Sequence, residues 1–254
     1  MQNAVAIRVQ RWLLAVGRAG AFVYDAARSM RDVDIWMSLT MRQMVRLGVQ
    51  SLPISLFIAA FTGIVLALLS SYSFSGAVPL YFVGTLVGKT VMMELTPVLT
   101  GLALAGRVGA NIAAELGTMR VTEQVDALET LAYDPQSYLV VPRVIAATFM
   151  FPVVVALAMG VGVFFGWLTA INLLDLSSTE FMKGLRLFYE FKDIWFGLVK
   201  SASFGFTIAV IGCFKGLSTT GGAEGVGRAT MQAVVLSAEM IIVLDAFWAV
   251  VLLN

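Results

Sequence analysis

Ionisable side chains stand inside apolar stretches of this sequence, among them Glu94, Lys200, Glu239 and Asp245. A charge in hydrocarbon is costly, so each of them is a candidate functional residue. Lys89 would lie about 140° around a helix from Glu94 and cannot easily pair with it. Glu94 must therefore be protonated, paired with another helix, or open to a wet cavity. A structural carboxyl and a group on a substrate path both remain open.

Lys200, Glu239 and Asp245 form a second intramembrane set, in which Asp245 is the deeper acid. Pairing Lys200 with an acid would neutralise both charges in a low-dielectric medium. The alternative is a transport or proton-relay role. The chain has no His, which is the commonest general base and metal ligand. Cys213 is the only cysteine, which excludes a disulfide or a cysteine-rich metal site. We expect no catalytic residue and no metal ligand.

Two glycine-rich stretches superficially resemble nucleotide-binding loops. The first, GTLVGKT at residues 84–90, has one residue too few between its glycines and lies in an apolar segment. The second, at residues 225–229, has no preceding strand. We therefore expect no nucleotide site or other cofactor in this chain.

The composition places the protein in a membrane. Hydrophobic residues make up 59% and charged residues 13% of the chain, and the mean hydropathy is +0.88. Soluble domains have roughly 45–50% and 25%, respectively. The net charge of +1 argues against a nucleic-acid partner, which would call for a concentrated basic face. We predict an all-α polytopic membrane protein.

Hydrophobic segments of about 20 residues predict five transmembrane helices. Residues 47–88 carry no charge and are too long for one span, and a Ser-, Gly- and Pro-containing stretch after residue 69 indicates a turn within them. The expected spans are residues 47–69, 80–106, 144–171, 194–214 and 231–253. They define a permease domain at 47–254, preceded by a helical region at 1–46.

Residues 1–30 predict an amphipathic helix lying at the membrane surface. Valines and Trp12 fall on one side at helical spacing, whereas Arg8, Arg11 and Arg18 fall together on another. The alternative is a helix that packs on the protein's own membrane domain, and the two interpretations can coexist.

Lys and Arg counts set the expected orientation. They place the N-terminus and residues 107–143 in the cytoplasm, the loop between spans 3 and 4 outside, and the C-terminus in the periplasm. Ser177 and Glu180 in the outer loop predict a capping box that begins a short surface helix.

The 107–143 segment combines an apolar stripe with acidic residues. Between Glu115 and Asp134 there are five acids and one base, Arg120. The apolar stripe comprises Val121, Val125, Leu128 and Ala132, and the acids on the other face are Glu123, Asp126 and Glu129. Long connections of this kind tend to be functional. We expect a docking helix for a basic groove on a partner; the alternative is a helix lying against the membrane or the protein's own spans.

Small residues and prolines predict how the spans pack. Gly162 and Gly166 form a G-x-x-x-G pair, and Ser201, Gly205 and Ala209 repeat a small residue every four positions, which allows close helix approach. Such pairs occur within one chain as well as between chains. Pro53, Pro97 and Pro152 predict breaks or kinks unless neighbours satisfy the freed carbonyls.

Two runs resemble a known family. They are ELTPVLTGLALAGRVGANIAAELGTMRVTEQVDALETLAYDPQSYLVVPR, from Glu94 to Arg143, and GGAEGVGRATMQAVV, at residues 221–235. With the five-span layout, they are similar to MlaE-type permeases, the membrane subunits of ABC lipid transporters that work with MCE proteins. The resemblance covers residues 47–254.

This resemblance implies a homodimeric permease in the bacterial inner membrane that carries phospholipid between the inner and outer membranes. The partners it implies are a cytoplasmic ABC ATPase, which would bind ATP and Mg and perform the hydrolysis, a periplasmic MCE protein and often a STAS-domain protein. The chain itself would not be an enzyme. The residues it implies for ATPase coupling are Glu115, Arg120, Glu123, Asp126 and Glu129.

The same resemblance implies a lipid pocket near Glu94 and Leu95. Spans 1 and 2 would supply its apolar walls, and we expect Tyr72 and the serines beside it at the outer mouth. Family members commonly carry Arg-Glu-Leu-Gly-Pro where this chain has Met93-Glu94-Leu95-Thr96-Pro97. The missing arginine changes how Glu94 is neutralised. A stand-alone secondary transporter that relays protons through its intramembrane acids is the main alternative. An intramembrane enzyme would need a Ser–Lys or carboxylate pair, and none is evident.

Overall fold

The computed structural model describes residues 14, 17–18, 20–30, 33–74, 79–174, 176–187 and 189–253. Within these residues every regular element is helical and no strand occurs. Five helical stretches are long and apolar enough to cross a membrane: Trp36–Ser73, Phe82–Val121, Gln136–Leu173, Phe191–Leu217 and Gly222–Val251. The prediction of an all-α polytopic membrane protein is confirmed. The protein is a multi-pass membrane protein.

The five stretches divide into individual elements as follows. The first contains α2 (Val33–Leu47), the 3-10 turn η1 (Val49–Ser51) and α3 (Leu52–Ser73). The second contains α4 (Phe82–Thr90), η2 (Val91–Leu95), α5 (Thr96–Leu104), η3 (Ala105–Gly109) and α6 (Ala110–Val121). Then come α7 (Gln124–Thr130), η4 (Gln136–Val140), α8 (Val141–Leu173), α9 (Ser178–Leu187), α10 (Phe191–Leu217) and α11 (Gly222–Leu253).

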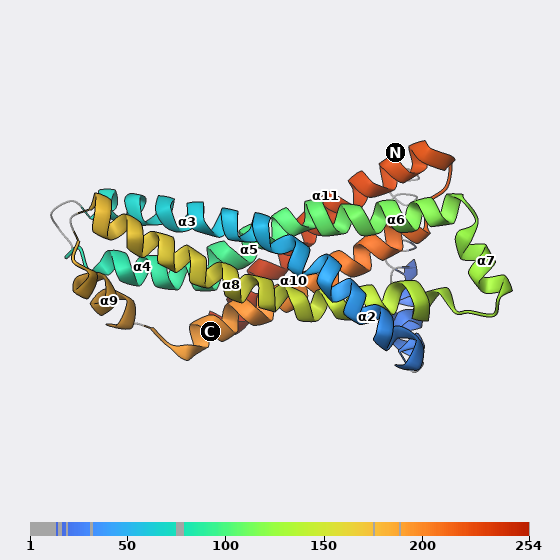
Figure 1. Ribbon diagram of the computed structural model, residues 1–254, viewed down its shortest axis with the longest axis horizontal. Coiled ribbons are helices and arrows are strands. Elements are labelled where there is room, and N and C mark those ends of the chain that lie inside the picture. Colours follow the sequence, from blue (N-terminus) through green and yellow to red (C-terminus); the bar gives the residue numbers. More distant parts are fainter. Residues whose placement is uncertain are drawn as a thin grey trace, which may run out of the picture.

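The helical stretches are longer than a bilayer requires. A stretch of 38 residues, such as Trp36–Ser73, extends roughly 57 Å at 1.5 Å per residue, against a hydrocarbon core of about 30 Å. Figure 1 shows the result: a rod in which α2, α6 and α7 lie toward one end and α4 and α9 toward the other. The helix of the second span continues past residue 106 to Val121, and that of the fifth begins at Gly222, ahead of the expected residue 231.

Glycines bring the spans into close contact within one chain. A Cβ on Gly63 of α3 would overlap the Gly162 carbonyl of α8, and Gly166 packs against the Gly63 carbonyl. Gly205 of α10 lies in the same way against the Ala147 carbonyl of α8. The predicted small-residue pairs are therefore used between helices of the same chain, where the absence of a side chain lets the backbones approach.

A second set of glycines holds α6 against α10. Gly212 and Gly216 of α10 face Ile112, Ala113 and Leu116 of α6 without space for a larger side chain. The side of α6 that faces α10 is buried, with Ile112, Ala113 and Leu116 almost fully covered. α6 therefore extends from the second span as a firmly packed helix.

None of the three predicted prolines, Pro53, Pro97 and Pro152, ends a helix. Pro53 and Pro97 lie in the first turns of α3 and α5, whereas Pro152 lies inside α8, which continues through it. The π-helical turn η2 directly precedes α5. Pro97 has no N–H to donate to the preceding turn, which fits a local widening of the helix at that point.

The described part of the N-terminal region packs on the protein's own spans. Residues 20–29 are helical, and Phe22 contacts Phe214 of α10 edge-on, with ring centroids 5.5 Å apart. Phe22 and Ala26 border the main buried core. The predicted faces that carry Val5, Arg8, Arg11 and Trp12 lie outside the described residues.

The predicted capping box at the start of α9 is confirmed. Glu180 accepts hydrogen bonds from the backbone N–H and hydroxyl of Ser177, and the Glu180 N–H donates to the Ser177 hydroxyl. These bonds hold the pKa of the Glu180 carboxyl below its usual value of 4.5. A second box begins α10, formed by Glu190 and Asp193.

Candidate functional site: an intramembrane charge cluster and an acidic tip

Lys200 joins the two intramembrane acids that the sequence left in separate sets. Its Nζ donates a hydrogen bond to Glu94 Oε2 at 2.8 Å and lies 2.8 Å from Asp245 Oδ1. The lysine side chain has no exposed surface, whereas Glu94 is 35% and Asp245 26% exposed. The expected pairing of Lys200 with an acid is thus present, and a second acid from another helix completes the cluster.

Each member of this Lys200 cluster comes from a different span. Glu94 lies in the π turn η2 of the second span, Lys200 in α10 and Asp245 in α11. The ring of Phe196, one turn before Lys200, lies 4.5 Å from its Nζ and covers the cation. π turns occur frequently at functional sites. The sequence signal for this turn is Pro97, whose effect on the preceding backbone could not be located from residue types alone.

The cluster holds more carboxyl groups than amino groups. One buried amino group faces two carboxyl groups, and both acidic side chains retain exposed surface. The exposed edge therefore offers hydrogen-bond acceptors in the middle of an apolar bundle. Such an edge can hold the polar end of an amphiphile while its apolar part stays against the helices.

The other predicted intramembrane residues lie apart from this cluster. Glu239 is exposed on α11 and has no hydrogen-bond or ion-pair partner among the described residues. Lys89 instead approaches Asp193 at the start of α10, with Nζ 3.9 Å from Oδ2. Leu95 is half-buried beside Glu94, whereas Tyr72 is exposed near the end of α3.

The acidic residues of α7 and of its N-cap point away from the protein. Glu123, Asp126 and Glu129 are exposed, and Asp126 forms an ion pair of 2.5 Å with Arg120 of α6. The apolar side faces inward, because Val125 is buried and Leu128 packs against the main core. Val125 and Leu128 of the predicted stripe therefore pack within the chain, as the alternative interpretation expected, whereas Ala132 is exposed and the acids remain available.

Two exposed apolar side chains follow the acids. Leu131 and Tyr133 are both exposed at the end of α7, and Ala132 between them has a left-handed φ of 61°. Glu123, at the other end of α7, has a φ of 60°. The two left-handed residues bracket a short, sharply bent segment at the tip of the rod, which Figure 1 shows beyond α6. Sequence reasoning missed Leu131 and Tyr133, because neither continues the helical stripe.

Asp134 closes this segment by capping the next helical turn. Its carboxylate accepts hydrogen bonds from the N–H groups of Gln136 and Ser137 and from the Ser137 hydroxyl. Partial burial would raise the pKa of this carboxyl, but the hydrogen bonds from the Ser29 side chain, Ser137 and Gln136 outweigh it and hold the pKa below its usual value of 3.8.

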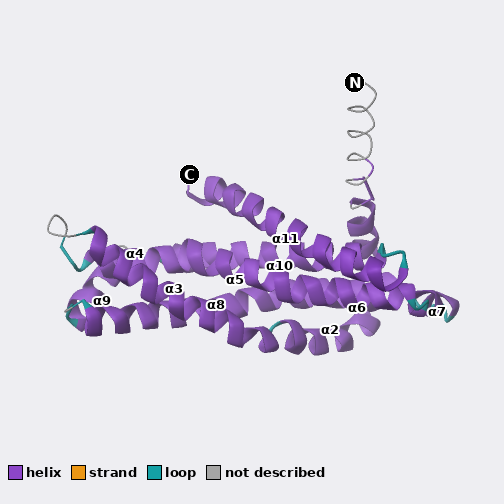
Figure 2. Ribbon diagram, turned by 90° about the horizontal axis from the view of Figure 1, so that it is seen from above, coloured by secondary structure: helices purple, strands orange, loops and turns teal. Residues whose placement is uncertain are grey.

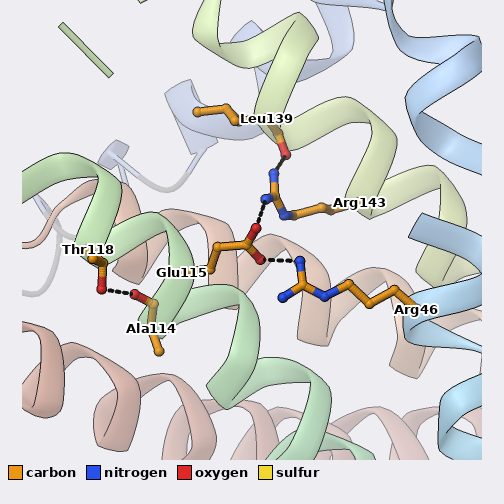
Figure 3. Close-up of polar contacts among 6 residues, drawn as sticks. All are labelled: Arg46, Ala114, Glu115, Thr118, Leu139 and Arg143. Carbon is orange, nitrogen blue, oxygen red and sulfur yellow. Dashed lines mark hydrogen bonds and ion pairs between the residues drawn. The ribbon is translucent and has the colours of Figure 1, made fainter. Parts of the chain in front are cut away.

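Glu115 and Arg120 lie on α6, outside the exposed tip. Glu115 pairs within the chain with two arginines, Arg46 of α2 and Arg143 of α8 (Figure 3). Among the residues predicted for coupling, Glu123, Asp126 and Glu129 therefore share one exposed surface, and Glu115 faces the protein's own helices.

These features define a class of protein: a helical membrane subunit with five spans, an intramembrane charge cluster and an acidic segment at one tip. The family model described as "Permease MlaE" matches residues 40–251. The chain belongs to the MlaE permease family.

Relatives from distant organisms support this assignment. A probable ABC transporter permease protein of Rickettsia felis is 43% identical over 241 residues, which cover 95% of this chain and 93% of the relative. A probable ABC transporter permease protein of Synechocystis is 42% identical over 208 residues, covering 82% and 79%. The chloroplastic protein TRIGALACTOSYLDIACYLGLYCEROL 1 of Arabidopsis thaliana is 36% identical over 206 residues, covering 81% and 59%. The chain is a permease subunit of an ABC transporter and is not itself the catalytic subunit.

Proposed function

We propose that this permease moves phospholipids between the inner and outer membranes of a bacterium. The observation that carries the proposal is the Lys200 cluster, which places two partly exposed acidic side chains among apolar spans. A phospholipid whose head group carries an ammonium or hydroxyl donor has the matching shape, with that donor for the acceptor edge of Glu94 and Asp245 and acyl chains for apolar helix surfaces. The Arabidopsis relative bears the name of a glycolipid, which further supports a lipid substrate.

In this proposal a separate ABC ATPase supplies the energy and docks on α7. Leu131 and Tyr133 are the apolar anchors, and Glu123, Asp126 and Glu129 form an acidic rim around them. Buried apolar anchors surrounded by a polar rim are typical of protein interfaces. ATP and Mg belong to the partner, and no cofactor binds this chain.

A second copy of this chain covers the free face of α11. Val235, Glu239 and Ile242 share one side of that helix and are all exposed. Figure 2 shows the C-terminal half of α11 diverging from the rest of the rod. An exposed carboxyl on a membrane span calls for a protein partner, because lipid tails cannot solvate it. A homodimer supplies that partner.

The acidic tip lies in the cytoplasm and α9 lies at the periplasmic surface of the inner membrane. Arg and Lys counts support this orientation, since they concentrate at the α2 and α6 end. The N-terminus is then cytoplasmic and the C-terminus periplasmic. A periplasmic MCE protein receives or delivers lipid on the α9 side, and a STAS-domain protein accompanies the ATPase.

Affinity purification of this chain from its native membrane in mild detergent tests the function. Mass spectrometry of the particle should find an ABC ATPase, an MCE protein and bound phospholipid. A particle that holds this chain alone, under conditions that preserve known ABC complexes, would contradict the proposal. Transport driven by a pH gradient without ATPase would then favour a secondary transporter that relays protons through Glu94 and Asp245.

A further inference from the structure

Glu115 is the one carboxylate of α6, and it holds two arginines from different helices at once. Its Oε2 accepts a hydrogen bond from Arg46 at 2.8 Å, and its Oε1 lies 3.1 Å from a terminal nitrogen of Arg143. Figure 3 shows the carboxylate between the two guanidinium groups. Arg46 belongs to α2, which leads into the first span, and Arg143 belongs to α8, the third span. The Glu115 bridge therefore ties three helices together.

The contact with Arg143 is the enclosed side of the bridge. The Arg143 side chain is only 5% exposed, and one terminal nitrogen donates to the Leu139 carbonyl of η4. Its Nε has no hydrogen-bond partner among the described residues. Separating Glu115 from Arg143 would leave a buried guanidinium without its counter-charge, which is strongly unfavourable. α6 and α8 are therefore expected to move as one body.

The contact with Arg46 is the open side. The Arg46 side chain is 47% exposed, so water can replace the carboxylate when the two separate. Exposed ion pairs contribute little and break easily. The Arg46–Glu115 contact between α2 and α6 can thus break without leaving the Arg46 charge unsolvated.

α6 leads directly into α7, the segment proposed to bind the ATPase. Only Thr122 and Glu123 separate the two helices. α6 is also held against α10 through Gly212 and Gly216. A displacement of α7 therefore passes into α6 and α10, and through the Glu115 bridge into α2 and α8, which pack on each other.

We propose that Glu115 is a positioning residue for transport, which keeps α6 fixed to α8 while making and releasing Arg46 of α2. Through this bridge, ATPase movement at α7 reaches the first and third spans, which pack on each other through Gly63 and Gly162. The inference rests on the proposed function, because it assigns the ATPase to α7. It gives Glu115 a role inside the chain and not at the ATPase surface.

The first test uses the complex with its ATPase in proteoliposomes of bacterial phospholipids. Glu115→Gln and Arg46→Gln should retain ATPase association and hydrolysis, but move about five-fold or more less lipid per ATP hydrolysed. Arg46→Lys, which keeps the charge, should restore the wild-type ratio. Glu224→Gln removes an exposed acid from an ion pair with Arg228 and is the matched control.

Each outcome decides the proposal. A wild-type ratio in both Gln variants would overturn it, as would a loss of ATPase association in Glu115→Gln, which would make Glu115 a docking residue. If the wild-type chain binds no ATPase, the proposed function fails, and hydrogen exchange on the chain alone tests the bridge. Faster exchange of α6 and α7 amides in Glu115→Gln than in Glu224→Gln supports the bridge, and equal exchange contradicts it.

Discussion

At the scale of single residues, Lys200 shows how a charge is kept inside an apolar bundle. Two carboxylates and the ring of Phe196 surround its ammonium group, so no part of the side chain remains exposed. Within the described part of the chain, its ion-pair partners are Glu94 and Asp245. Lys200 is thus the ion-pair partner of Glu94, which the sequence left open.

Lys200→Met should destabilise the protein by about 3 kcal/mol, because it leaves Glu94 and Asp245 facing each other without a cation. Thermal unfolding in detergent measures the effect. Adding Glu94→Gln and Asp245→Asn to the same variant should recover most of the loss. Lys192→Met removes an exposed lysine from the same helix and serves as the control. Equal unfolding temperatures for the two lysine variants would contradict a stabilising cluster.

At the scale of elements, α7 has one side that packs on the chain's own core and another side that is exposed. Its inward side, Val125 and Leu128, packs on the chain's own core, which fixes the direction of the helix. The acids and the following Leu131 and Tyr133 then face outward. The length and apolar stripe of the segment are explained by folding, and its exposed residues are left for a partner.

Glu123→Lys combined with Glu129→Lys should weaken association with the ATPase by at least about ten-fold, because like charges would then face a basic groove. Co-purification of the ATPase with the variant measures this. The control, Glu224→Lys, reverses the charge of an exposed side chain at the start of α11, outside α7. This variant should bind the ATPase as the wild type does. Unchanged co-purification of the double variant would argue against docking on this face.

At the scale of the whole molecule, α11 is the least covered of the five spans. Its apolar side chains Val235, Ile242, Val243 and Phe247 are all exposed, and Glu239 lies among them. The other four spans bury their small residues against one another. A second copy placed on α11 would make this span an internal helix of the assembly.

Ile242→Cys should form a disulfide between two copies in the membrane, because the proposed homodimer places the two α11 faces together. The native Cys213 is buried and does not compete. Phe149→Cys, on an equally exposed site of α8, is the control and should stay monomeric on a non-reducing gel. Cross-linking through Phe149→Cys alone would place the dimer contact elsewhere.

The class of the protein and the number of spans could be read from the sequence. The hydropathy of a segment depends only on its own residues, and the thickness of the bilayer fixes the length of a span. The five spans could therefore be predicted without knowing which helices pack against one another. The capping box of Ser177 and Glu180 was equally local. The positions of Glu94, Lys200 and Asp245 inside spans were visible too, although their union in one cluster was not.

Only the tertiary structure decided which groups meet. The partners of Lys200 depend on the rotation of three helices about their axes, and glycine contacts such as Gly197 with Met92 and Gly101 with Phe204 and Ile241 help to set that rotation. The same packing buries Val125 of α7, leaves Glu239 exposed, and brings Arg46 and Arg143 to Glu115. Helical periodicity predicts which residues share one face of a helix, but only tertiary packing determines which residues of other helices that face contacts.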